Sequence, residues 1–118
     1  MSAMSNAWKQ YRQGQPDAAI SEFERILSED KTNVDALYGI GLAQRAAGKY
    51  EVALESFQTA LDIVKTVSAQ QMEARRAAYG DKLATQNDPT SSEDDRYLML
   101  LRMLTQRVSE TKTALEAH

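Results

Sequence analysis

The chain repeats itself at an interval of 34 residues, and this repeat limits the fold more than any other feature of the sequence. When the sequence is shifted by 34 positions, Gly14 falls on Gly48 and Phe23 falls on Phe57. Further pairs keep a small, apolar or polar character in the same order: Ala7 with Gly41, Gln10 with Gln44, Ala19 with Ala53, Ile20 with Leu54, Leu27 with Leu61 and Lys31 with Lys65. A fixed period of this length indicates stacked supersecondary units.

Each unit has the pattern of two helices joined by a tight turn. Gly14 and Gly48 stand where the first helix ends, because glycine accepts the positive φ that a helix C-terminus often requires. In the second helix, apolar residues recur at three- and four-residue spacing, as in Ile20, Phe23 and Leu27. A hairpin of this kind cannot bury its apolar face alone, so the units are expected to stack.

These residues resemble the tetratricopeptide repeat family. The second unit, residues 34–67, has residues that the family favours at ten positions: Leu37, Ile40, Gly41, Gly48, Tyr50, Ala53, Leu54, Phe57, Ala60 and Leu61. The first unit, residues 1–33, resembles the family mainly in its second helix. Both units depart from the family at the closing position, where Lys31 and Lys65 stand in place of the common proline. The resemblance implies an all-α fold, a right-handed α-solenoid of helical hairpins.

The pattern predicts about six helices in one domain, residues 1–118. Four are expected within the repeats, over residues 3–13, 16–29, 34–47 and 50–64, with Pro16 in a first turn and Asn33 as an N-cap. Residues 68–118 do not continue the repeat and are predicted to form a divergent helix pair. Its first helix would begin at Ser68, a loop would lie near residues 87–92, and a long C-terminal helix would close the solenoid.

Several classes of chemistry are excluded by composition. The chain has no cysteine and one histidine, His118, so disulfides, thiolate chemistry, multi-histidine metal sites and a Ser-His-acid triad have no basis. Glu93, Asp94 and Asp95 are adjacent on a predicted helix and point in different directions, which favours capping over metal binding. We therefore expect no enzyme, no metal and no cofactor.

Net charge and hydropathy limit the kinds of partner and the cellular location that are expected for this chain. The net charge of −3 gives no reason to expect nucleic acid. The longest apolar run, residues 97–101, is far shorter than the ~20 residues that span a bilayer, so no membrane partner is expected. Because no secretory signal is visible either, a cytoplasmic location is expected.

The resemblance implies that the first helices of both repeats line a concave groove that binds a protein or peptide. The candidate groove residues are Trp8, Tyr11, Arg12, Tyr38, Leu42 and Arg45. Such aromatic and arginine side chains suit a peptide or helix with apolar anchors and an acidic flank. In the alternative, Trp8 and Tyr38 pack against the chain's own C-terminal helices. The family's Lys and Asn carboxylate clamp is not expected, because other residues, Met4, Trp8 and Gly39, stand at its positions.

The predicted C-terminal helix is apolar on more than one face. One stripe contains Tyr97, Leu101, Leu104, Val108 and Leu115, while Leu98, Met99 and Met103 lie off it. The helix is therefore a candidate cap, a candidate homodimer contact through the off-stripe residues, or a segment that folds back into the groove. The leading hypothesis is a non-catalytic protein–protein interaction scaffold, and the alternative is a self-association module.

Overall fold

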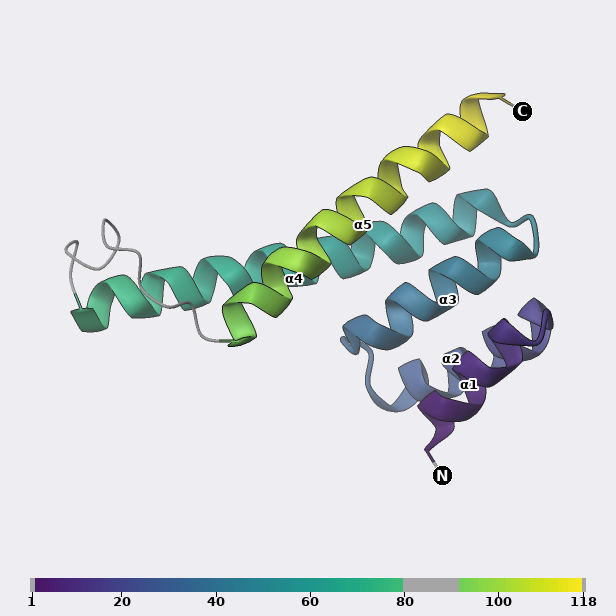
Figure 1. Ribbon diagram of the computed structural model, residues 1–118, viewed down its shortest axis with the longest axis horizontal. Helices are drawn as coiled ribbons and strands as arrows, with labels where there is room; N and C mark the ends of the chain where they lie inside the picture. The colour runs from purple at the N-terminus through teal and green to yellow at the C-terminus, as the bar shows by residue number, and fades with distance from the viewer. Residues whose placement is uncertain (1, 80–91, 118) are drawn as a thin grey trace.

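The computed structural model describes residues 2–79 and 92–117, and this part of the chain contains helices and no strands. Its five helices are α1 (Ala3–Arg12), α2 (Pro16–Glu29), α3 (Val34–Ala46), α4 (Tyr50–Tyr79) and α5 (Ser92–Ala117). Each helix packs against the next along the chain, and α1 also contacts α3. Figure 1 shows the resulting stack, with α3 between the α1–α2 hairpin and α4. The all-α solenoid expected from the repeat is confirmed.

The two repeats share the same turn at the level of single backbone hydrogen bonds. Gly14 and Gly48 have φ values of 76° and 82°. The residue after each glycine donates its N–H to a carbonyl five residues back, Gln15 to Gln10 at 3.0 Å and Lys49 to Gln44 at 2.8 Å. This is the bond pattern of a glycine-terminated helix end, and its recurrence at an offset of 34 shows that the repeat is a repeat of backbone geometry.

The helix starts follow the sequence signals closely. Asn33 caps α3, with its Oδ1 accepting the backbone N–H of Ala36 at 3.1 Å. Pro16 is the first residue of α2, where its missing N–H removes no intrahelical hydrogen bond. Ser2 caps α1 in the same way as Asn33, accepting from the N–H of Ser5 at 3.1 Å.

Helix α3 is held between two buried phenylalanine rings that lie on glycines. A Cβ placed on Gly41 would come within 2.5 Å of Cε1 of Phe57 on α4, and a Cβ placed on Gly39 would collide with the ring of Phe23 on α2. Both phenylalanines are fully buried. Helices α3 and α4 therefore approach closely at Gly41, and the contact of Phe23 with Gly39 joins the first repeat to the second.

Helix α4 differs from the expectation. The helix predicted to end near Val64 continues through Ser68 to Tyr79, and the expected boundary between residues 67 and 68 falls inside it. No glycine or proline interrupts residues 50–79, so nothing ends the helix where the repeat ends. The predicted loop at 87–92 lies almost entirely outside the described residues, and Ser92 begins α5.

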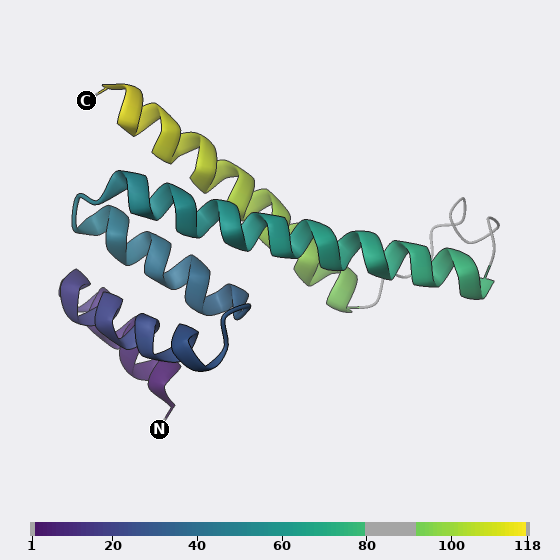
Figure 2. The same ribbon diagram turned by 180° about the vertical axis from the view of Figure 1, so that it is seen from behind.

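Helix α5 runs antiparallel to α4 and covers one side of it. Figure 1 shows α5 in front of α4 and α1 in front of α2, and Figure 2 shows the reverse order from behind. Leu104 and Val108 pack in one cluster with residues of α4, and Leu104 is fully buried there. Thr111 of α5 is also fully buried. The Thr111 hydroxyl donates to the carbonyl of Arg107 at 2.7 Å, which satisfies it within the helix. Helix α5 thus places a third helix on the face formed by α1 and α3.

The ring-on-glycine contact predicts an unusual response to a helix-favouring substitution. Gly41→Ala is expected to lower the free energy of unfolding by about 1–2 kcal/mol, because the clash with Phe57 outweighs the better helix propensity of alanine. Urea unfolding followed by circular dichroism measures the change. In a Phe57→Leu background the same substitution should cost less, since the colliding ring is gone. A more stable Gly41→Ala protein would contradict the contact.

Candidate functional site

A pocket is lined by side chains from α1, α3, α5 and the first residue of α4. Its volume is about 240 Å³, and its lining residues are Tyr11, Leu42, Arg45, Ala46, Tyr50 and Arg107. Three of these, Tyr11, Leu42 and Arg45, are among the expected groove residues. A pocket of this size is smaller than the ~300–1,000 Å³ of drug-sized ligand sites and matches one or two side chains.

Tyr38 lies in the protein core, and Trp8 is partly buried against it. The Trp8 ring meets Phe23 edge-on, with centroids 5.3 Å apart, and is half-buried. Tyr38 is 9% exposed and packs in one cluster with Leu104 and Val108 of α5. For Tyr38, the structure therefore matches the alternative in which it packs against the C-terminal helix. Trp8 does not line the pocket, but its ring lies 6.0 Å from that of Tyr11, which does.

Charged side chains from α3 and α5 form a network at the edge of the pocket. Arg45 and Arg107 both donate through Nη1 to the same oxygen, Oε2 of Glu110, at 3.0 and 2.9 Å. The other oxygen, Oε1, accepts from Nε2 of Gln106 at 3.1 Å. Arg107 also donates through Nε to the phenol oxygen of Tyr38 at 3.2 Å. The network thus connects α5 to α3 across a sequence separation of 65–69 residues.

This network shifts the pKa values of its two titratable α5 members, Glu110 and Arg107, in opposite directions. The pKa of Glu110 is lowered, first by the hydrogen bond from Arg107 and then by that from Arg45, although partial desolvation opposes this. The pKa of Arg107 is raised, mainly because its guanidinium donates to Tyr38 and Glu110. Both groups therefore stay charged at neutral pH, and two guanidinium groups share one carboxylate.

The two repeats match a known protein family. The sequence profile of the tetratricopeptide repeat family matches residues 5–67, just over half of the chain. The chain belongs to the tetratricopeptide repeat family. Repeats of this family generally mediate protein–protein interaction, and the family is typically one of non-catalytic scaffolds. No curated protein and no solved structure matches the chain.

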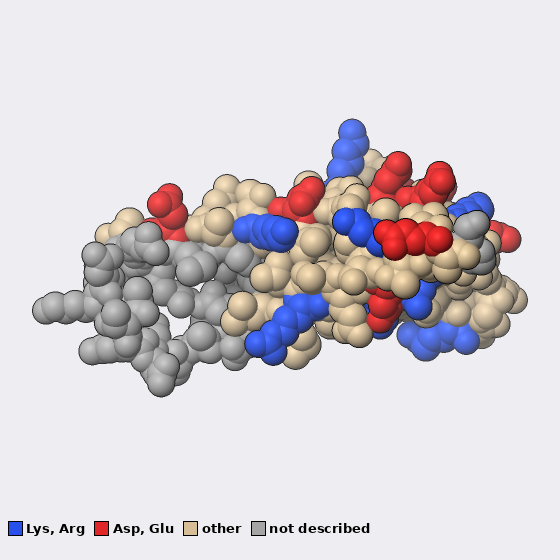
Figure 3. All heavy atoms as spheres, turned by 90° about the horizontal axis from the view of Figure 1, so that it is seen from above, with Lys and Arg blue, Asp and Glu red and all other residues tan. Residues whose placement is uncertain are grey.

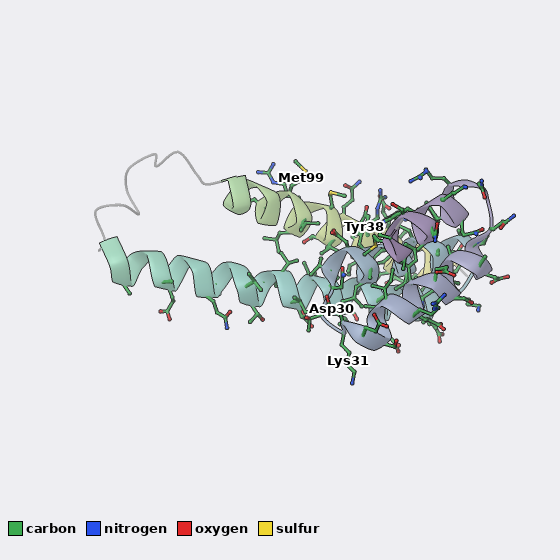
Figure 4. All side chains as sticks on the ribbon, turned by 90° about the horizontal axis from the view of Figure 1, so that it is seen from below. Asp30, Lys31, Tyr38 and Met99 are labelled. Atoms are coloured by element: carbon green, nitrogen blue, oxygen red, sulfur yellow. The ribbon has the colours of Figure 1, made fainter. Side chains whose placement is uncertain are left out.

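The remaining predicted site residues of this tetratricopeptide repeat protein are dispersed. Arg12 is exposed in the last turn of α1 and does not line the pocket. Leu98 and Met99 are 50% and 63% exposed on α5. Met103 is half-buried and packs against the core, so it does not share their exposure. Figure 4 shows Met99 pointing away from α4, and Tyr38 inside the stack.

Sequence reasoning missed the α5 half of the site. Arg107 and Glu110 directly precede Val108 and Thr111, two buried residues of α5. Their position beside the buried stripe was the available signal, because residues at the edge of such a stripe reach neighbouring helices. The signal was not sufficient, since the repeat pattern stops before α5 and does not indicate which face meets α3.

Other kinds of site find no support in the described part of the chain. It contains no cluster of three or more His, Cys, Asp or Glu side chains able to hold a metal ion. The side chains of Glu93, Asp94 and Asp95 are not among those that the structure describes. Across the same residues, no helix has the length and apolar character needed to cross a membrane. The face in Figure 3 carries acidic and basic side chains interspersed, without a broad area of one sign.

The lowered pKa of Glu110 predicts a pH-dependent contribution to stability. In the wild type, ionised Glu110 should add stability at neutral pH relative to Glu110→Gln. That difference should shrink as the pH falls below the ordinary glutamate value of about 4.3 and through the lower pKa of the folded state. Urea unfolding of both proteins between neutral and acidic pH measures it.

A matched variant separates the network from simple loss of charge. Glu116→Gln removes one negative charge from an exposed position of the same helix. A stability difference for Glu110→Gln that equals that of Glu116→Gln at every pH would contradict the network.

Proposed function

We propose that this chain is a non-catalytic interaction module that holds a segment of a partner protein in the pocket between α1, α3 and α5. The observation that carries the proposal is the pocket itself, which is formed by helices from both repeats and from α5. The family's general role in protein–protein interaction supports it. This pocket occupies only part of the groove face, because α5 already contacts Tyr38 there.

The chemistry of the pocket suits a peptide segment. Tyr11, Leu42 and Tyr50 offer apolar and aromatic surface, and Arg45 and Arg107 offer charged donors. Tyrosine and arginine dominate binding energy at protein interfaces, because they combine large contact area with directional hydrogen bonds. Trp8 and Tyr38 take a supporting role in this proposal, since Trp8 contacts Tyr11 and Tyr38 accepts a hydrogen bond from Arg107, two residues that line the pocket.

Ala46 provides a test of the pocket that leaves the core intact. It lines the pocket yet is exposed, so Ala46→Glu adds a longer, negatively charged side chain at the pocket wall without placing a charge in the protein core. Peptides selected from a displayed random library on the wild-type protein should bind Ala46→Glu at least about tenfold more weakly, a loss of about 1.4 kcal/mol. Fluorescence anisotropy of labelled peptides measures the affinity.

The control places the same substitution on another face. Ala18 is also exposed on a helix, in α2, and is not among the residues that line the pocket. Ala18→Glu should leave peptide affinity unchanged. Equal affinities for wild type, Ala46→Glu and Ala18→Glu would contradict binding in this pocket.

A second candidate function is self-association through α5. Leu98 and Met99 support it, because they are two of the three large hydrophobic residues that are exposed in the described part of the chain, the third being Val52 of α4. Exposed apolar side chains on adjacent positions favour burial against another surface. Met103 contributes less than expected, since it already packs against the core.

Self-association predicts a mass that depends on concentration. Sedimentation equilibrium of the wild type should show a dimer, and Leu98→Gln with Met99→Gln should return it to a monomer by removing the apolar contact. Val52→Gln is the matched control, because it removes an exposed apolar side chain from α4. A wild type that stays monomeric at high concentration would exclude this candidate.

A further inference from the structure

We propose that Arg45 and Arg107 form a site for an acidic side chain of the partner segment, with Glu110 setting its strength. The inference rests on the proposed function, because it names the partner chemistry that the pocket would select. It follows from the way α3 and α5 bring two guanidinium groups together at one wall of the pocket.

The donor count leaves capacity for a second carboxylate. A guanidinium carries five N–H donors. Toward Glu110, each arginine uses Nη1, and Arg107 uses Nε toward Tyr38. Each side chain is about one third exposed, at 36% for Arg45 and 33% for Arg107. Both therefore have N–H groups within reach of a ligand in the pocket.

The local charge favours an anion even though the whole chain is acidic. Two positive side chains share the single negative charge of Glu110, whereas the chain as a whole has a net charge of −3. Glu110 is absent from the residues that line the pocket and lies in the neighbouring hollow on α5 with Leu101 and Gln106. A partner carboxylate in the pocket thus reaches the arginines without having to take the position of Glu110.

The hydrogen bonds also hold the two guanidinium groups in fixed orientations, which favours recognition of a carboxylate. Glu110 and Tyr38 hold the Arg107 guanidinium from two sides, and Glu110 holds that of Arg45. A guanidinium fixed in this way loses little rotamer freedom when a carboxylate binds. Leu42, Tyr11 and Tyr50 form the adjacent wall, so the expected motif is an acidic residue next to an apolar or aromatic one.

Glu110 orients the two arginines, and it also weakens their attraction for a partner carboxylate. Its carboxylate lies within 3.0 Å of both guanidinium groups and offsets part of their charge. Because it comes from α5 and one arginine comes from α3, the strength of the site depends on how α5 sits against the second repeat. The family match ends at residue 67, so α5 supplies this feature from outside the repeats.

The experiment compares selected peptides with their amide analogues. Peptides from the displayed library are sequenced, and each acidic residue is replaced by Asn or Gln in a matched synthetic peptide. Acidic residues should be enriched over the library, and the amide analogue should bind the wild type about tenfold more weakly, as expected for loss of a charged hydrogen bond. Affinities are measured by fluorescence anisotropy.

Two variants assign the effect to the network. Arg45→Gln should weaken the acidic peptide and leave the amide analogue unchanged, so that the ratio of the two affinities approaches one. Glu110→Gln should raise the ratio, because the competing carboxylate is removed. The controls are Arg25→Gln, at an exposed position of α2, and Glu116→Gln, at an exposed position of α5. They make the same charge changes away from the network and should preserve the wild-type ratio of affinities.

The outcomes separate this inference from the proposed function. Selected peptides without acidic enrichment, or an Arg45→Gln protein that weakens both peptides alike, would overturn the acidic site and leave the pocket in place. A ratio unaltered by Glu110→Gln would overturn the role given to Glu110. A library that yields no peptide sensitive to Ala46→Glu would overturn the pocket and the acidic site together.

Discussion

The seating of two phenylalanine rings on the glycines of α3 sets the spacing on which the rest of the molecule depends. Phe23 reaches α3 from the first repeat and Phe57 reaches it from the second. Each ring occupies the volume that a side chain would fill, so α2 and α4 approach the backbone of α3 closely. This close packing fixes the position of α3 against α1 and α5, and therefore the position of Leu42 and Arg45 at the pocket.

The repeated part of the fold could be predicted from the sequence because its determinants are local. Glycine at a helix end, proline at a helix start and asparagine before a helix each act within a few residues, and Gly48, Pro16 and Asn33 all act as expected. The end of α4 could not be predicted in the same way. The repeat period ends near residue 67, but helix termination requires a breaking residue, and none is present before Tyr79.

The site was only half predictable for a related reason. Tyr11, Leu42 and Arg45 were found because the family pattern assigns them to the groove face. Arg107 and Glu110 lie on a helix that the repeat does not describe, and their contacts with Tyr38 and Arg45 join residues 65–69 positions apart. Such contacts depend on how α5 is rotated and placed on α4, which a single sequence does not specify. The placement of α5 also explains why Tyr38 is part of the core, since Leu104 and Val108 pack in one cluster with it.

The sequential packing of the helices also has a consequence for cooperativity. In an array where each element contacts mainly its neighbours, stability is a sum of local terms and nearest-neighbour interfaces. Helix α5 contacts chiefly α4, and it reaches α3 through the cluster that Leu104 and Val108 form with Tyr38 and through the hydrogen bonds of Arg107 and Glu110. Weakening the buried contacts of Leu104 or Val108 therefore acts on one end of the stack, while the α1–α2 hairpin keeps its own interface with α3. Helix α5, which supplies Arg107 to the pocket, can therefore lose stability separately from the α1–α2 hairpin, which supplies Tyr11.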